Sequence, residues 1–226
     1  NNDLLFGLAL YNYYAEVIPE KYPILKPFAL LFPKGDKKKG IQQLQITIQK
    51  GNYAKTEALY FLLQIYYVYE NDFIKAANCA LQLHEKYPNS SFFYAYLGRA
   101  YAASGYWRKA TDIYADIVDK CKKNVPHYTK YYEREAHFYL GMSLMNEKKY
   151  SEALEHFKIA DQLSLTVDYD DNSAYQTLIV LRIGMIYDAT GSRSQAIVQY
   201  KKVLEMKDFK DAHTMARDYL ETPYSG

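Results

Sequence analysis

Residues 35–40 have the glycine spacing of a loop that binds phosphate through backbone N–H groups, reading Gly-Asp-Lys-Lys-Lys-Gly. Such a loop continues with Lys and then Ser or Thr, which contact the phosphates and a magnesium ion. This chain continues instead with Ile41-Gln42, and the prolines upstream leave no preceding strand. We therefore interpret 35–40 as a solvated turn followed by the start of a helix.

A second candidate site is an acidic segment, residues 168–172, that could bind a metal ion. Asp168, Asp170 and Asn172 alternate as the first oxygen ligands of a calcium-binding loop do. Ser173 stands where that loop needs glycine, and Ile179 stands where a glutamate would bind the metal with both oxygens. We interpret the segment as a solvated acidic loop, and we expect no metal site and no cofactor.

The histidines and cysteines form no pattern typical of a catalytic or metal site. No H-E-x-x-H and no G-x-S-x-G is present, and Cys79 and Cys121 lie too far apart in sequence for a C-x-x-C motif. His137 and both cysteines are expected to be packed inside helices. The sequence thus predicts a protein without catalytic activity, and an enzyme with no recognisable motif stays a weaker alternative. The five histidines are His84, His127, His137, His156 and His213.

The composition excludes several partners. The 28 basic and 26 acidic residues give a formal net charge of +2, too little to gather nucleic acid, so none is expected as a partner. No apolar run reaches the roughly 20 residues of a membrane span, so the chain is expected to be soluble. It begins at Asn1, not at methionine. We expect it in the cytoplasm or, where a signal or lipid anchor precedes Asn1, in a bacterial periplasm or cell envelope.

A pattern of large and small residues recurs four times and indicates the helices that would position any binding site. In each copy the step from a Leu or Ile to a later alanine is constant, as in Leu63 to Ala76. Small Gly and Ala positions allow two antiparallel helices to approach closely, so each copy predicts a helical hairpin. The copies are Tyr60-x2-Leu63-Gln64-x2-Tyr67 with Ala76-x3-Ala80, Tyr94-x2-Leu97-Gly98-x2-Tyr101 with Ala110-x3-Tyr114, His137-x2-Leu140-Gly141-x2-Leu144 with Ala153-x3-Phe157, and Val180-x2-Ile183-Gly184-x2-Tyr187 with Ala196-x3-Tyr200.

These residues resemble the tetratricopeptide repeat (TPR) family, whose pattern is W-x2-L-G-x2-Y, then A-x3-F, then P. The resemblance covers about residues 56 to 206, with longer spacing before the third and fourth copies and no tryptophan at the first position. It implies an all-α fold, a right-handed α-α superhelix or solenoid of antiparallel hairpins. It also implies that the first helix of each hairpin lines a concave face that binds a protein.

We expect one solenoid domain over 1–226. It would comprise a diverged N-terminal hairpin at 1–52, TPR-like hairpins at 56–89, 90–123, 127–165 and 172–206, and a capping helix at 208–222. The first hairpin carries an insertion at 19–33 with four prolines and many apolar residues, too apolar for a free linker. We expect this insertion to pack on the edge of the solenoid, and a partner-binding flap is the alternative.

The leading hypothesis is a scaffold or adaptor that binds a partner polypeptide of unknown identity in an aromatic and methionine-lined groove. One alternative is a structural subunit that docks through 19–33 into a larger assembly, either of the cell envelope or another multiprotein complex. Another, because tyrosine is abundant, is a glycan-binding module. We expect a monomer, with a weak homodimer as the alternative. The predicted groove residues are Phe61, Ile65, Phe92, Tyr96, Arg99, Phe138, Tyr139, Met142, Met145, Leu181, Arg182, Met185 and Asp188.

Overall fold

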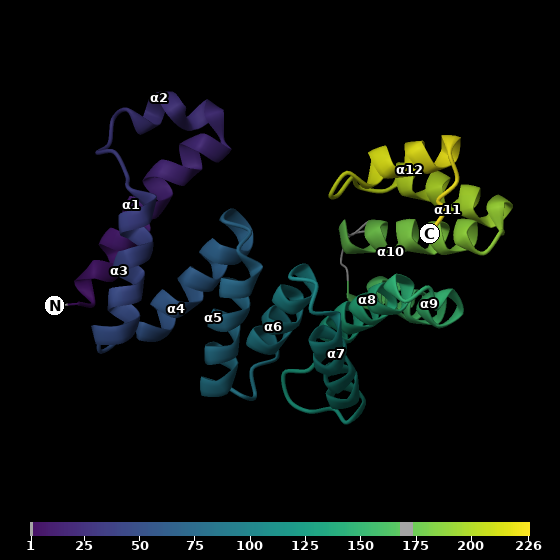
Figure 1. Cartoon of the computed structure of the whole chain (residues 1–226), viewed down its shortest axis with the longest axis horizontal. Helices are drawn as coiled ribbons and strands as arrows, with labels where there is room; N and C mark the ends of the chain where they lie inside the picture. The colour runs from purple at the N-terminus through teal and green to yellow at the C-terminus, as the bar shows by residue number, and fades with distance from the viewer. Residues whose placement is uncertain (1, 168–173) are drawn as a thin grey trace. The chain divides into compact units, whose positions relative to one another are not determined.

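The computed structural model describes residues 2–167 and 174–226, and throughout these ranges the only regular secondary structure is helical (Figure 1). The predicted all-α fold of antiparallel hairpins is confirmed. The acidic segment with Asp168, Asp170 and Asn172 lies outside the described residues. The chain divides into two compact units, residues 1–104 and 105–226, which are described separately. The organisation as one domain stays a prediction.

Unit 1 is a series of antiparallel helices in which each long helix packs on the next. A π-helical turn, η2 (Ile65–Tyr69), extends the fourth helix. Its helices are α1 (Leu4–Lys21), the 3-10 turn η1 (Pro23–Leu25), α2 (Lys26–Ala29), α3 (Lys37–Lys50), α4 (Lys55–Gln64), α5 (Phe73–Lys86) and α6 (Ser91–Ala103).

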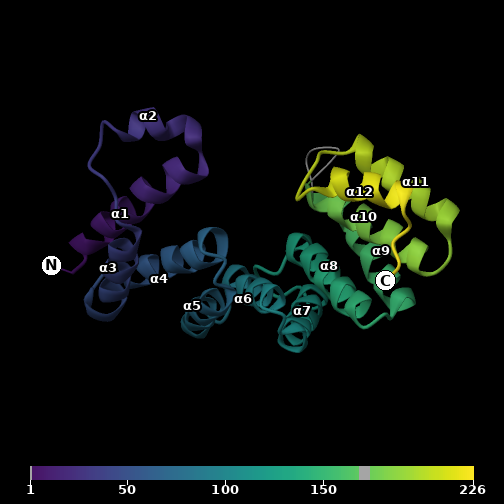
Figure 2. The ribbon, with the colours of Figure 1, turned by 45° about the horizontal axis from the view of Figure 1, so that its top comes forward.

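Unit 2 continues the same architecture with longer helices and ends in an added helix (Figure 2). The helix after the last hairpin, α12, packs on α10 and α11, and its Ala212 and Ala216 have no exposed surface. The helices are α7 (Trp107–Lys122), α8 (Lys130–Asn146), α9 (Tyr150–Val167), α10 (Ala174–Ala189), α11 (Arg193–Glu205) and α12 (Ala212–Glu221).

Local sequence fixes several helix ends. The carboxylates of Asp36 and Asp72 and the hydroxyl of Ser90 each accept a hydrogen bond from the backbone N–H three residues later, which satisfies an otherwise unpaired helix N-terminus. The expected helix start within 35–40 is observed at Lys37, but the segment is not a solvated turn throughout, because Gly35 and Gly40 are buried against α1. Gly105 and Gly191 adopt left-handed backbone at the ends of α6 and α10, where glycine is favoured.

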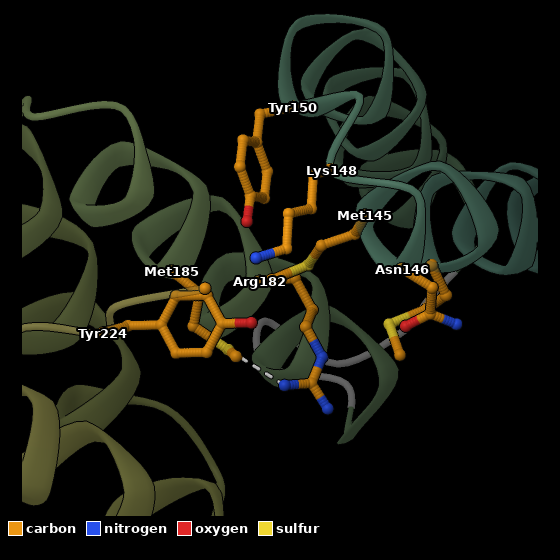
Figure 3. A pocket seen from close by; sticks show the side chains of 9 residues that line it. Met145, Asn146, Lys148, Tyr150, Arg182, Met185 and Tyr224 are labelled. Carbon is orange, nitrogen blue, oxygen red and sulfur yellow. Dashed lines mark hydrogen bonds between the residues drawn. The ribbon is translucent and has the colours of Figure 1, made fainter.

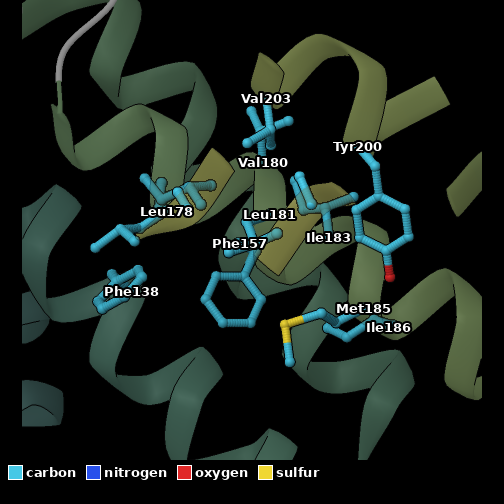
Figure 4. Close-up of a cluster of buried hydrophobic side chains, with 14 of the residues drawn as sticks. Phe138, Phe157, Leu178, Val180, Leu181, Ile183, Met185, Ile186, Tyr200 and Val203 are labelled. Atoms are coloured by element: carbon cyan, nitrogen blue, oxygen red, sulfur yellow. The ribbon is translucent and has the colours of Figure 1, made fainter. Parts of the chain in front are cut away.

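The glycines of the repeat are sites of close helix packing. A Cβ atom on Gly184 of α10 would lie 2.7 Å from Cε1 of Tyr200 on α11, and one on Gly141 of α8 would lie 3.0 Å from the Phe157 ring on α9. Phe157 and Tyr200 are themselves fully buried. Figure 4 shows both rings within the apolar core of unit 2. In these two hairpins the small residue thus lets an aromatic ring of the partner helix lie directly against the backbone.

His137 is buried, as expected, and pairs with a second histidine. Its Nδ1 lies 2.9 Å from Nδ1 of His156 on the partner helix of the hairpin, so one ring donates and the other accepts. Burial, and secondarily the proximity of His156 and Lys122, lowers the pKa of His137 to about 4. Burial also lowers the pKa of His156.

The expectation that 19–33 packs on the edge of the solenoid is wrong. The α1 helix runs to Lys21 through Pro19, and the chain then projects as η1 and α2 before returning to α3 (Figure 1). Apolar side chains along this projection are exposed to solvent; they include Ile24, Phe28, Leu30, Leu31 and Phe32. Their composition favours burial, but unit 1 leaves them at its surface.

Candidate functional site

The predicted groove residues fall into two sets, one in each unit. In unit 1, a continuous set of side-chain contacts connects α4 and α6. We call this set the aromatic face; it consists of the predicted residues Phe61, Phe92, Tyr96 and Arg99 together with Tyr60. In unit 2, part of the predicted set lines a pocket on α8 and α10, here called the methionine pocket.

The aromatic face is built from rings in close contact. The ring centroids of Tyr60 and Phe92 are 5.9 Å apart, and those of Phe92 and Tyr96 are 4.9 Å apart. The guanidinium of Arg99 lies 4.8 Å from the centroid of Tyr96. All of these side chains are at least partly exposed, and Phe92 has 38% of its surface accessible. The arrangement offers apolar surface with one cation, the composition of interface centres.

One predicted groove residue of unit 1, Ile65, is inaccessible to a partner. Ile65 has no exposed surface and belongs to the core of unit 1. Its neighbour Gln64 accepts a hydrogen bond from the Tyr96 hydroxyl at 3.4 Å, while its buried amide nitrogen has no acceptor among the described residues. The aromatic face therefore has an unused donor at its edge.

The methionine pocket has a volume of about 300 Å³ and lies in unit 2. Four predicted residues line it, although two of them, Met145 and Met185, are largely buried in its walls. Figure 3 shows Lys148, Tyr150 and Tyr224 directing their polar ends toward the pocket. The lining residues are Met142, Met145, Asn146, Lys148, Tyr150, Arg182, Met185, Tyr224 and Gly226.

Arg182 gives the pocket its chemistry. Its Nη1 donates to the Met185 sulfur at 2.9 Å, a weak acceptor, and its buried Nε has no partner among the described residues. Burial lowers the pKa of the guanidinium. Among the described residues no Asp or Glu side chain lines the pocket, and Lys148 adds a second positive charge. Methionine walls around an incompletely hydrogen-bonded cation suit a ligand with an apolar body and an oxygen acceptor.

The segment after α12 forms one wall of the pocket, because a buried carboxylate holds it. Oδ2 of Asp188 accepts from the Arg193 guanidinium at 3.0 Å, the Tyr200 hydroxyl at 2.9 Å and the backbone N–H of Tyr224 at 3.0 Å. The Asp188 side chain has no exposed surface. Predicted as a groove residue, Asp188 instead positions Tyr224 beside the pocket.

Other predicted residues belong to the core of unit 2 or pack against it. Leu181 is fully buried, and Phe138 is 7% exposed between Phe157 and Tyr175. Tyr139 is partly exposed and stacks on Tyr114 with centroids 4.6 Å apart. None of these three lines the methionine pocket.

Sequence reasoning missed Asn146, Lys148, Tyr150 and Tyr224. The first three flank the turn between α8 and α9, at the end of the predicted first helix, so extending the groove to that turn would have included them. Tyr224 lies beyond the last repeat and carries no periodic signal.

Neither metal chemistry nor membrane spanning finds support in the described residues. They contain no cluster of three His, Cys, Asp or Glu side chains that could hold a metal ion. Across residues 2–167 and 174–226, every helix is too short or too polar to cross a bilayer.

No protein-family model matches the sequence, and a sequence search of curated proteins gives no significant match. Solved structures are similar in fold. One of MamA matches with a TM-score of 0.56 at 18% identity, over 80% of this chain and 91% of that one. YrrB, described as a TPR protein with an unusual peptide-binding site, matches with 0.55 at 16% identity, over 96% and 97%. TTC0263, a TPR protein of Thermus thermophilus, matches with 0.56 at 18% identity, over 87% and 95%.

Proposed function

Because the chain has the fold of TPR proteins, we propose that it is a non-catalytic scaffold that binds a partner polypeptide through the methionine pocket and the aromatic face. The observation that carries the proposal is Arg182, a partly buried cation among methionine side chains, whose buried Nε has no acceptor among the described residues. The peptide-binding site of YrrB supports this use of the fold.

The chemistry of the pocket specifies the partner. Met142, Met145 and Met185 can adapt to an apolar side chain such as leucine, methionine or phenylalanine. Arg182 and Lys148 favour a carbonyl or carboxylate oxygen next to that side chain. We propose a segment in which an apolar residue lies beside an acidic residue, bound on an interaction surface whose anchors carry most of the affinity.

The aromatic face would bind a second, mainly apolar part of a partner. Phe92 and Tyr96 are accessible and contact each other, and Arg99 lies against the Tyr96 ring. Aromatic side chains with these properties are typical anchors of protein interfaces.

The test is selection of peptides from a random library on the full chain, followed by titration calorimetry of the selected peptides. Peptides that use the pocket should bind Arg182→Gln about 10- to 100-fold more weakly, the effect of losing a charge-assisted hydrogen bond. Lys201→Gln, on the exposed surface of α11, is the matched control and should bind as the original chain does. Phe92→Ala with Tyr96→Ala tests the aromatic face.

Equal affinity of Arg182→Gln and the original chain for every selected peptide would refute the pocket assignment. Phe138→Ala is unsuitable here, since Phe138 belongs to the core and its loss would destabilise unit 2.

A further inference from the structure

The loop between α1 and α3, residues 22–34, presents apolar side chains to solvent. Leu30 is 87% exposed, Ile24 81%, Leu31 78% and Phe32 64%. We infer that the tip of this loop, residues 24–32, inserts into the surface of a lipid bilayer that contains anionic lipids. The proposal concerns a surface separate from both proposed peptide sites.

The loop is fixed at its base, so its exposure is a built feature of unit 1. The backbone N–H of Asp36 donates to the carbonyl of Asn12 at 2.9 Å, and that of Lys37 donates to Glu16 at 2.9 Å. The Tyr11 hydroxyl donates to the carbonyl of Pro33. A Cβ atom on Gly35 would lie 2.5 Å from the Asn12 carbonyl oxygen, so the returning chain lies directly on α1.

The charge of the segment matches an anionic surface. Residues 20–39 contain six lysines against two acidic residues, Glu20 and Asp36, whereas the whole chain has 28 basic and 26 acidic residues. The rest of the chain is therefore slightly acidic, and the positive charge is concentrated at the loop. Lys26 lies within the tip, Lys34 follows it after Pro33, and Lys38 and Lys39 are on the first turn of α3.

Not every lysine of the segment contributes equally. Lys37 pairs with Glu70 at 3.3 Å, and the ammonium of Lys21 lies 4.6 Å from the ring centroid of Tyr69. These two charges are engaged within unit 1. Lys26 and Lys34 adjoin the apolar side chains, so they would lie at the headgroups when the tip is inserted.

The composition of the tip favours a bilayer over a protein partner. Peripheral membrane proteins insert Leu and Phe side chains into the bilayer and place Lys side chains at the headgroups. This arrangement combines apolar insertion with electrostatic attraction. Lysine is depleted from protein interfaces, which are enriched in Tyr, Trp, Phe, Met and Arg; of these enriched types residues 24–32 contain only Phe. Within η1 and α2 no side chain is buried, so the tip also lacks the packed groove of a peptide-binding module.

The test is flotation of the full chain with vesicles of phosphatidylcholine alone or with about one third phosphatidylserine, at a fixed lipid concentration. We expect binding to the anionic vesicles that weakens at high salt, because salt screens the lysines. Lys26→Gln with Lys34→Gln should weaken binding about fivefold per lysine, the fold-change expected for one basic residue at such a surface. Lys201→Gln with Lys202→Gln, exposed on α11, is the matched control.

The apolar contribution is tested by Leu30→Ser, Leu31→Ser and Phe32→Ser combined, which should lower affinity by roughly tenfold per side chain. These side chains are exposed, so the fold should be retained, as circular dichroism would show. Leu165→Ser with Val198→Ser removes similarly exposed apolar side chains elsewhere and should bind normally. In Phe32→Trp the new indole should shift its emission to shorter wavelength when vesicles are added.

The inference is overturned if anionic vesicles fail to bind the chain, or if the serine variant binds as well as the original. It is also overturned if the tip variants lose a protein partner while vesicle binding is absent, which would make the loop a protein-docking element. Failure of the peptide selection would leave the vesicle result unaffected.

Discussion

Acidification should destabilise unit 2 through the pair His137–His156. In the unfolded chain histidine titrates near its ordinary pKa of about 6.5, whereas burial lowers the pKa of folded His137 to about 4. The unfolded state therefore binds more protons between these pH values, and stability falls as pH falls. Two pKa values about 2.5 units apart correspond to a loss of about 2 kcal/mol between pH 8 and pH 5, and at most about 3 kcal/mol below pH 4.

The measurement is urea unfolding at pH 8, 6.5 and 5, followed by the fluorescence of Trp107, the only tryptophan, which belongs to unit 2. His137→Gln keeps a polar side chain but cannot titrate, so it should lose most of the pH dependence over this window. His127→Asn removes an exposed histidine at a left-handed position that Asn tolerates, and should keep it. Equal slopes with pH for His137→Gln and the original chain would refute the reasoning.

Two further predictions concern packing and reactivity. Gly184→Ala should destabilise unit 2 by about 1–3 kcal/mol, because its Cβ would lie 2.7 Å from Tyr200. Gly7→Ala, whose Cβ would have no atom within 4 Å, should be neutral or stabilise α1 by up to about 1 kcal/mol. Urea unfolding of both variants measures these changes, and a neutral Gly184→Ala would contradict the prediction. Burial raises the pKa of the Cys79 thiol to about 12, so Cys79 should react with a thiol reagent at pH 8 only after unfolding; fast modification of folded protein, located by mass spectrometry, would disprove this.

The fold could be predicted because close helix packing restricts residue size at fixed spacing. Gly141 and Gly184 recur where aromatic rings of the partner helix leave no room for a side chain, and that requirement is visible in the sequence. Helix starts such as Asp36 follow from local capping, which depends on three neighbouring residues.

The sites could be predicted only in part. Leu181 and Arg182 are consecutive on a predicted helix, but which of the two a neighbouring helix covers depends on tertiary packing. In the structure Leu181 is fully buried and Arg182 lines a pocket. Tyr224 reaches the pocket because Asp188 binds its backbone, a contact without any periodic signal. The prediction for the apolar loop is wrong because composition indicates only that a segment favours burial. It does not indicate whether the same chain has an apolar surface against which the segment can pack.

The fixed base of that loop also bears on protein engineering. Backbone contacts of Gly35 and Asp36 with α1 hold the returning chain, while the side chains from Ile24 to Phe32 contribute little to the packing of unit 1. The sequence of the tip can therefore be exchanged for another short peptide while the helices beneath it keep their structure. We therefore expect the loop to accept grafted epitopes on a base that stays fixed to α1.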